Sequence, residues 1–217
     1  MPPGRRIPRP PDTAPERPPL PEPSDATISA DVAKAAGELN FLAADIRECD
    51  ACGRAADTRV FGTGYPRARI MLLKDAPSSA DLESGNAFTQ EADALAKAFE
   101  ALRIPPAWVY GSTAVRCGVT DPSVDELTAC SGHLVTEIEA VQPTVIVAFG
   151  PRAVDALRAS NGRCGIRVPD EVPRGEPVTV RADLVLIATE QLPDGLTGRD
   201  AKRRLWRDMQ AIPKLIA

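Results

Sequence analysis

The sequence has few aromatic residues, a single histidine and no long apolar run. Aromatic side chains make up 4% of the 217 residues, and His133 is the only histidine. No stretch approaches the ~18 apolar residues that a membrane-spanning helix requires, and the N-terminus lacks the apolar core of a secretory signal peptide. The composition, 43% apolar and 26% charged, is typical of a globular protein. We therefore expect a cytoplasmic protein with no membrane partner.

Positive charge is not in excess either. The formal net charge is −4 and the isoelectric point is about 5.2. This argues against nucleic-acid binding through bulk charge but is compatible with a local basic groove. One basic cluster lies near the C-terminus, and it predicts either phosphate contacts or a solvated helix face. The cluster consists of Arg199, Lys202, Arg203, Arg204 and Arg207.

Prolines are concentrated at the start of the chain. Ten of the 22 prolines lie in residues 1–27, where apolar side chains are almost absent. Such a segment cannot bury enough apolar surface to offset its ordering entropy. We expect a disordered proline-rich tail over residues 1–27, which either docks on a protein partner or on DNA or has no partner. The folded domain is expected over residues 28–217.

Short apolar runs alternate with helical patterns throughout residues 28–217. The apolar runs predict a strand followed by a glycine turn at 60–64, and further strands at 70–73, 108–110, 143–150, 178–180 and 184–188. Apolar residues at helical spacing predict helices at 29–46, 91–102, 124–141 and 199–209, and Pro151 opens another. This alternation predicts an α/β fold with a mainly parallel sheet. Because ligands of such sheets bind beyond the carboxyl ends of the strands, the candidate loops are 74–79, 111–116 and 189–196.

Four of the five cysteines form two groups. Cys49 and Cys52 have the spacing C-x2-C, and Cys117 and Cys130 follow after a long gap with the spacing C-x12-C. Cysteines of cytoplasmic proteins are more often ligands or catalysts than disulfide partners. Four thiolates in such groups can hold one zinc ion or one iron–sulfur cluster, and the spacing alone does not decide between them. The alternative is that Cys117 and Cys130 are ordinary buried residues.

An ordered set of segments over residues 42–209 resembles the uracil-DNA glycosylase superfamily, most closely its iron–sulfur branch (families 4 and 5). The segments are the Cys49–Cys52 pair, 60–64, 70–78, 81–88, 109–117, 126–134, 143–153, 174–175 and 206–208. The resemblance implies a monomer with a three-layer αβα fold and a central, mainly parallel, four-stranded sheet. It also implies a 4Fe–4S cluster, with zinc as the less favoured occupant, held by Cys49, Cys52, Cys117 and Cys130.

Members of this family flip a uracil out of DNA and hydrolyse its glycosidic bond, because a base inside a duplex is out of reach. The resemblance implies two catalytic residues. Asp75 is a carboxylate that orients water or balances charge on the sugar, and Gln191 stands where the family has a histidine that stabilises the leaving base. A neutral amide can still donate a hydrogen bond, but losing one such donor typically costs ~100–1000-fold in rate.

The resemblance further implies that Ala76, Pro77, Phe88 and Thr113 bind the base. Phe88 falls where the family stacks an aromatic ring on the flipped base. Thr113 aligns with a base-reading asparagine, and a single hydroxyl cannot donate and accept as an amide does. Strong discrimination of uracil is therefore not expected. Two family glycines are also replaced, by Lys74 and Ser78.

Residues implied to bind DNA follow Gln191. Leu192 and Leu196 occupy the loop that contacts the duplex in the family, where a leucine can wedge into the base stack. Arg199 and Arg203 belong to the basic cluster and are expected to contact phosphates.

Three hypotheses follow. The first is a divergent DNA-repair glycosylase with weakened or altered excision of uracil or another damaged base. The second is a non-catalytic iron–sulfur protein that binds DNA or acts as a scaffold. The third, a minor one, makes Lys74 a Schiff-base nucleophile in glycosylase-lyase chemistry.

Overall fold

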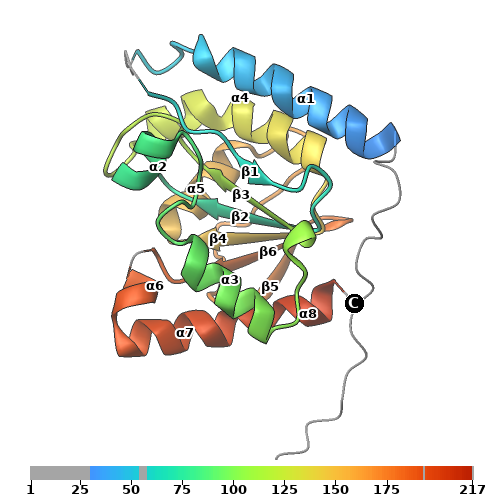
Figure 1. The fold of residues 1–217 in the computed structure, drawn as a ribbon, viewed down its shortest axis with the longest axis vertical. Helices are drawn as coiled ribbons and strands as arrows, with labels where there is room; N and C mark the ends of the chain where they lie inside the picture. Colours follow the sequence, from blue (N-terminus) through green and yellow to red (C-terminus); the bar gives the residue numbers. More distant parts are fainter. Residues whose placement is uncertain (1–29, 54–57, 193, 217) are drawn as a thin grey trace, which may run out of the picture.

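Six strands form one mixed sheet at the centre of the fold (Figure 1). The structure is a computed structural model that describes residues 30–53, 58–192 and 194–216. The expected tail over residues 1–27 lies outside the described residues. The strands are β1 (Thr63–Gly64), β2 (Ile70–Lys74), β3 (Val109–Thr113), β4 (Val145–Phe149), β5 (Pro177–Arg181) and β6 (Leu184–Thr189).

The four central strands are parallel, and the two edge strands are antiparallel to their neighbours. The order is β1-β3-β2-β4-β6-β5, with β1 antiparallel to β3 and β5 antiparallel to β6. Strands β2 and β4 are buried at every position, which explains why the sequence shows them as continuous apolar runs. The expected mainly parallel sheet of four strands is therefore confirmed as the centre, and two edge strands extend it to six.

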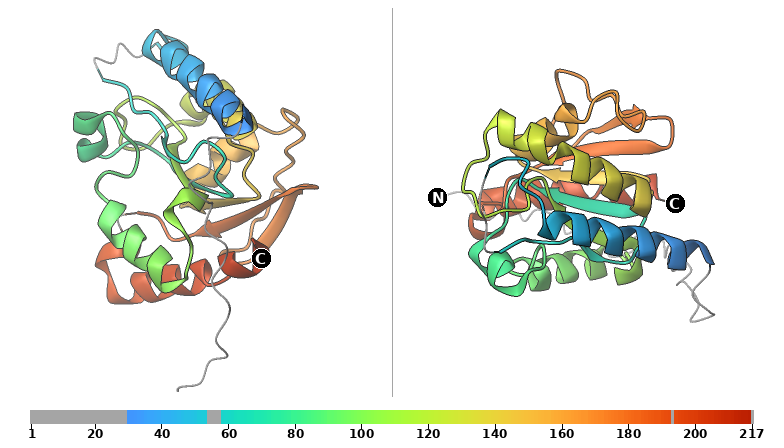
Figure 2. Two further views of the ribbon diagram at one scale, coloured as in Figure 1. Left: turned by 45° about the vertical axis from the view of Figure 1, so that its right-hand side comes forward. Right: turned by 90° about the horizontal axis from the view of Figure 1, so that it is seen from above.

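Helices cover both faces of the sheet and give the three expected layers. Helices α4 (Val124–Val141) and α5 (Pro151–Ala159) pack on one face, and α1 (Ala30–Arg47) lies outside α4. Helices α3 (Ala92–Ala101) and α7 (Arg199–Met209) pack on the other face. Figure 2 shows α1 beside α4 in the view from above. No helix in the described ranges is both long and apolar enough to span a bilayer.

Short helices complete the fold. They are α2 (Ser79–Ser84), the 3-10 helix η1 (Pro106–Trp108), α6 (Asp194–Thr197) and α8 (Ile212–Leu215). The segment that begins α2 was expected to be only a polar loop. Ser78 and Asp81 form a capping box there, in which each side chain accepts the backbone N–H of the other. Two N–H groups at the start of α2 are thereby satisfied, which makes a helix of only six residues possible.

The register of the parallel strands aligns their carboxyl ends. Lys74 pairs with Thr113 of β3 and with Phe149 of β4, and Phe149 pairs with Thr189 of β6. These four residues form a row at one edge of the sheet. The loops that follow them leave the sheet side by side, so residues far apart in the sequence meet at this edge.

Candidate functional site

The loops at the carboxyl edge enclose a hollow of about 630 Å³, called here the edge hollow. Its walls come from the loop after β2, the turn before α3, residues 118–120 and the loop after β6. Five of the residues expected at the site line it. These five are Asp75, Ala76, Pro77, Gln191 and Leu192.

Asp75 and Gln191 meet in the edge hollow. Gln191 donates from Nε2 to Asp75 Oδ2 at 3.3 Å, and the Ala76 N–H donates to Asp75 Oδ1 at 2.8 Å. Burial raises the pKa of the Asp75 carboxyl, against the opposing effects of the Ala76 N–H and the Lys74 charge. One carboxylate oxygen accepts a backbone N–H and the other accepts the Gln191 side-chain amide. This arrangement can orient a water molecule or balance a positive charge.

The backbone of Gly150 makes room for Gln191. Gly150 has φ +85, and a Cβ atom there would lie 3.0 Å from Gln191 Cβ. A side chain at this position would meet both a strained backbone conformation and a close contact. The glycine therefore allows the turn after β4 to lie against the loop after β6.

Ion pairs and hydrogen bonds hold the loop after β6. Glu190 accepts two hydrogen bonds from Arg204, at 2.9 and 3.0 Å, and one from Arg174 at 2.9 Å. The Arg204 hydrogen bonds hold the pKa of Glu190 below its usual value. At the end of β6, Thr189 donates to Asp208 at 2.9 Å. Gln191 is thus attached to a well-anchored segment, and Arg204 of the basic cluster is engaged within the protein.

Lys74 lies buried between two carboxylates, and the three residues are called here the pocket cluster: Lys74, Asp81 and Glu91. Lys74 Nζ lies 2.5 Å from Asp81 Oδ2 and 2.9 Å from Glu91 Oε2. Asp81 also accepts the backbone N–H groups of Ser78 and Thr89. A nucleophilic lysine is favoured by apolar or cationic surroundings, and this amine has two anions instead. The geometry therefore gives no support to the Schiff-base hypothesis.

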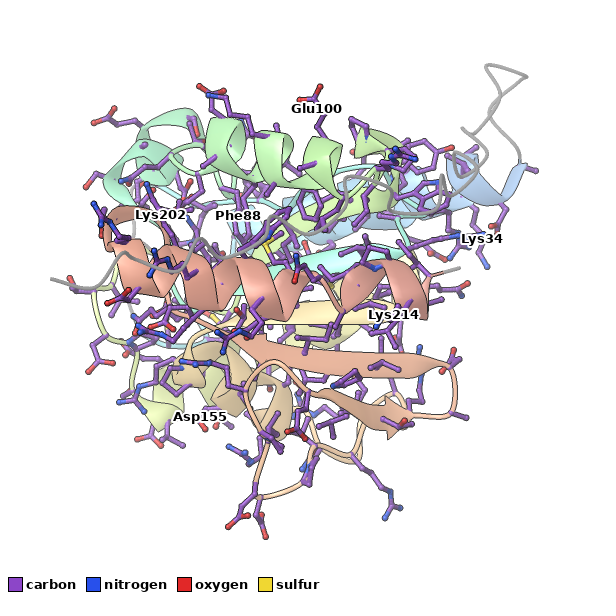
Figure 3. The ribbon with its side chains drawn as sticks, turned by 90° about the horizontal axis from the view of Figure 1, so that it is seen from below. Lys34, Phe88, Glu100, Asp155, Lys202 and Lys214 are labelled. Atoms are coloured by element: carbon purple, nitrogen blue, oxygen red, sulfur yellow. The ribbon has the colours of Figure 1, made fainter. Side chains whose placement is uncertain are left out.

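Two of the expected base-binding residues do not line the edge hollow. Phe88 is 5% exposed and contacts Phe149 edge to face, with ring centres 5.8 Å apart. It lines a separate, mainly apolar hollow of about 970 Å³ beside α3, and it lies between α3 and α7 in the view from below (Figure 3). Thr113 is fully buried, and its Oγ1 has no hydrogen-bond partner among the described residues.

The residues expected to bind DNA divide into two groups. Leu192 is buried and Leu196 is half-buried in the apolar cluster between the sheet and α7. Either leucine would have to leave this cluster to enter a duplex. Arg199 and Arg203 are exposed on α7, and Arg203 lies 3.5 Å from Asp200. The arginines are therefore accessible to phosphates, whereas the leucines are part of the core.

The four cysteines of the two groups gather on the α4 side of the sheet. Cys52, Cys117 and Cys130 line one very small cavity, and Cys49 is near enough to affect the pKa of Cys130. Burial raises the pKa of the Cys117 thiol to about 11, and the neighbouring Cys52 and Cys130 add to the increase. Within the described part of the chain, no three or more His, Cys, Asp or Glu side chains are arranged to hold a metal ion. The thiols of Cys52, Cys117 and Cys130 thus lie close together at one cavity, with Cys49 nearby.

Sequence reasoning missed Asp81 and Glu91 as partners of Lys74. The only local signal was the Ser-x-x-Asp capping pattern at residues 78–81. Glu91 is 17 positions from Lys74, and only the folded chain brings the two together.

Comparison with known proteins identifies the family. A model of the uracil DNA glycosylase superfamily matches residues 61–210. The Type-4 uracil-DNA glycosylase of Sulfurisphaera tokodaii is 34% identical over 106 residues, which cover 46% of this chain and 48% of that protein. The Type-4 uracil-DNA glycosylase of Saccharolobus solfataricus is 29% identical over 126 residues, which cover 55% of this chain and 58% of that protein. The chain thus spans about half the length of these relatives. Because the family model matches more than half of the sequence, the chain belongs to the uracil DNA glycosylase superfamily.

Proposed function

We propose that this chain is a DNA-repair N-glycosylase that binds DNA and hydrolyses the bond between deoxyribose and a flipped base. The base is uracil or another damaged base, and excision is weakened or altered relative to the Type-4 relatives. The observation that carries the proposal is the meeting of Asp75 and Gln191 in the edge hollow. The relatives' names as uracil-DNA glycosylases support the reaction type.

Each residue of the pair has a role in such a reaction. Breaking the glycosidic bond leaves positive charge on the sugar, and the bonding electrons depart with the base. Ionised Asp75 stabilises the sugar cation and orients the water that adds to C1′. The Gln191 amide turns from Asp75 to donate to the departing base. The proton released by the water neutralises the base through solvent.

We infer that Cys49, Cys52, Cys117 and Cys130 hold a 4Fe–4S cluster that stabilises the fold. Four thiols from three separate segments are a donor set that suits an iron–sulfur cluster or zinc. None of the four lines the edge hollow, so the group they hold lies outside it, although Val119 lines both the edge hollow and the cysteine cavity. We expect anaerobically purified protein to absorb visible light and to contain iron and sulfide. Zinc without sulfide would contradict the cluster.

Base release from modified DNA tests the reaction directly. Single- and double-stranded oligonucleotides carrying uracil, hypoxanthine or xanthine would be incubated with protein, and abasic sites revealed by alkaline cleavage. We expect release from at least one substrate, with kcat lowered by roughly 100–10,000-fold in Asp75→Asn. The matched control is Asp170→Asn, since Asp170 is exposed and outside the edge hollow. Equal activity of Asp75→Asn and the control would contradict the assigned role.

A second candidate function is a non-catalytic DNA-binding or scaffold protein, which we propose as the alternative. It is favoured by one observation: Phe88 and Thr113 are absent from the lining of the edge hollow. The proline-rich tail over residues 1–27 would then attach a protein partner. DNA binding without base release from any of the oligonucleotides would support this alternative.

A further inference from the structure

The ring of Phe88 is covered by a cation that belongs to the protein itself. Lys74 Nζ lies 5.0 Å from the centre of the ring. Lys74 and Glu91 line the edge hollow, whereas Phe88 does not. These two side chains therefore stand between Asp75, where the chemistry is proposed, and the only aromatic platform expected for a base.

We propose that Lys74 is a specificity-determining residue that occupies the place of a flipped pyrimidine over Phe88. This inference rests on the proposed function. With Lys74 in position, a planar base that enters the edge hollow cannot stack on the ring. The pocket then disfavours uracil and other ligands whose affinity depends on stacking.

Two contacts hold the ring of Phe88 in place beside Lys74. A Cβ atom on Gly111 would lie 2.7 Å from Phe88 Cδ2, so the ring already rests on the backbone of β3. Phe149 contacts it edge to face. Phe88 also has φ +64, an uncommon conformation for a residue with a side chain, which sets the direction of its Cα–Cβ bond. The ring borders the apolar hollow beside α3, but Lys74, which lines the edge hollow, covers one face of the ring. Removal of Lys74 therefore opens this face toward Asp75.

The pocket cluster explains why Lys74 stays on the ring. Lys74 and Glu91 are each 3% exposed and Asp81 is fully buried, so the three charges interact with little screening by water. Asp81 keeps two backbone N–H donors when the lysine is removed. Glu91 loses its pairing with the ammonium, so a test variant must neutralise Glu91 as well.

Two double variants separate the volume of Lys74 from its charge. Lys74→Gly with Glu91→Gln removes the side chain from the ring face. Lys74→Met with Glu91→Gln removes the same charges but keeps a long side chain there. Base binding is measured with free 5-fluorouracil by fluorine NMR, which requires no catalysis, and uracil release from DNA is measured in parallel.

We expect the glycine variant to bind 5-fluorouracil at least roughly tenfold more tightly than wild type and the methionine variant, since base–aromatic stacking is worth about that much. Uracil release should rise in the same order. Affinities equal within twofold in the three proteins, or no binding in any of them, would overturn the proposal. Equal gains in both double variants would also overturn it, because charge and not volume would then be the cause.

Failure of the proposed function gives a different result. If the glycine variant gains affinity for 5-fluorouracil but no protein releases any base from DNA, the glycosylase assignment fails and the role of Lys74 stands. If wild type releases uracil and the glycine variant gains neither affinity nor rate, the role of Lys74 fails and the glycosylase assignment stands. Circular dichroism checks folding, and should the glycine variant not fold, Lys74→Ser with Glu91→Gln carries the same test.

Discussion

Two clusters of buried charged side chains lie on opposite faces of the sheet and differ in their charge balance. The pocket cluster combines one cation with two carboxylates and borders the edge hollow. The other, called here the core cluster, combines one cation with one carboxylate and two hydroxyls on the α4 side. The core cluster consists of Tyr110, Ser112, Arg116 and Glu137.

In the core cluster, the other three side chains all donate hydrogen bonds to Glu137. Glu137 accepts from Tyr110 at 2.8 Å, from Arg116 at 2.5 Å and from Ser112. Burial disfavours the charged guanidinium of Arg116, but Glu137 outweighs this effect and raises its pKa. Burial and Glu137 also raise the pKa of Tyr110, so the phenol remains a donor. Burial therefore has different consequences: the core cluster joins α4 to β3, whereas the pocket cluster borders the edge hollow that contains Asp75.

The largest expected effect comes from breaking the core cluster. Glu137→Leu leaves the buried guanidinium of Arg116 without its carboxylate, and we expect a loss of about 3–5 kcal/mol in the free energy of unfolding. Denaturation in urea measures it. The double variant Arg116→Met with Glu137→Leu should recover part of the loss, because apolar replacement of a buried ion pair is often neutral, although Tyr110 and Ser112 still lose their acceptor. A double variant as unstable as the single one would contradict this account.

A smaller loss is expected in the pocket cluster. Glu91→Ala leaves Lys74 paired with Asp81, so the free energy of unfolding should fall by about 1.5–3 kcal/mol, the value of one hydrogen bond to a charged group. Glu100→Ala is the matched control, since Glu100 is exposed on α3 (Figure 3) and should change stability by less than about 0.5 kcal/mol. A cost for Glu91→Ala equal to that of Glu137→Leu would remove the distinction between the clusters.

The pH dependence of base release tests the role of Asp75 in the edge hollow. Because burial raises the pKa of Asp75, its ionised form is lost at a higher pH than for an ordinary aspartate as the solution is acidified. We expect the acid limb of the kcat profile to lie above pH 3.8, and Asp75→Asn to abolish that limb. The free energy of unfolding depends on pH in the opposite direction to kcat. The folded state binds the Asp75 proton more tightly, so stability falls as pH rises from 3.8 through the raised pKa. A limb retained in Asp75→Asn would assign it to another group.

The smallest effect is expected for an exposed pair. Arg152 Nε lies 3.1 Å from Asp121 Oδ1 at the surface. Arg152→Ala should lower the free energy of unfolding by no more than about 1 kcal/mol, and the loss should shrink at high salt. A larger loss that does not depend on salt would mean that this exposed pair contributes to stability in the same way as the two buried clusters.

Much of the fold could be predicted because it depends on local patterns. Continuous apolar runs marked β2 and β4, and the capping pattern Ser123-x-x-Glu126 marked the start of α4. The carboxyl-edge rule then located the hollow that Asp75 and Gln191 share. The prediction at 60–64 was less accurate: its apolar residues Val60 and Phe61 precede β1, and the strand is the exposed pair Thr63–Gly64, whose antiparallel direction is set by pairing with β3.

The interior of the site could not be predicted, because it depends on tertiary contacts. A lysine after an apolar strand gives no sign that two carboxylates will bury it. Sequence likewise placed Phe88 near the base without showing that Lys74 covers its ring. Thr113 was expected to face a ligand, but it is fully buried and does not line the edge hollow, whereas Leu192 is buried and still lines it. Position along the chain therefore indicated which residues gather at the edge, but not which of them meet the hollow.

The strand order has a consequence for how the protein acquires its site. The central strands lie in the order β3, β2, β4 and β6. Parallel neighbours need long crossover connections. Strand β2 lies between β3 and β4, which both follow it in the sequence. Such pairings close long loops, so folding is slow compared with that of helical bundles of similar size. The row of strand ends from Thr113 to Thr189 exists only when all four strands have paired. A partly folded chain therefore has no edge hollow, and binding competence during refolding should arise only with the last strand to join the sheet.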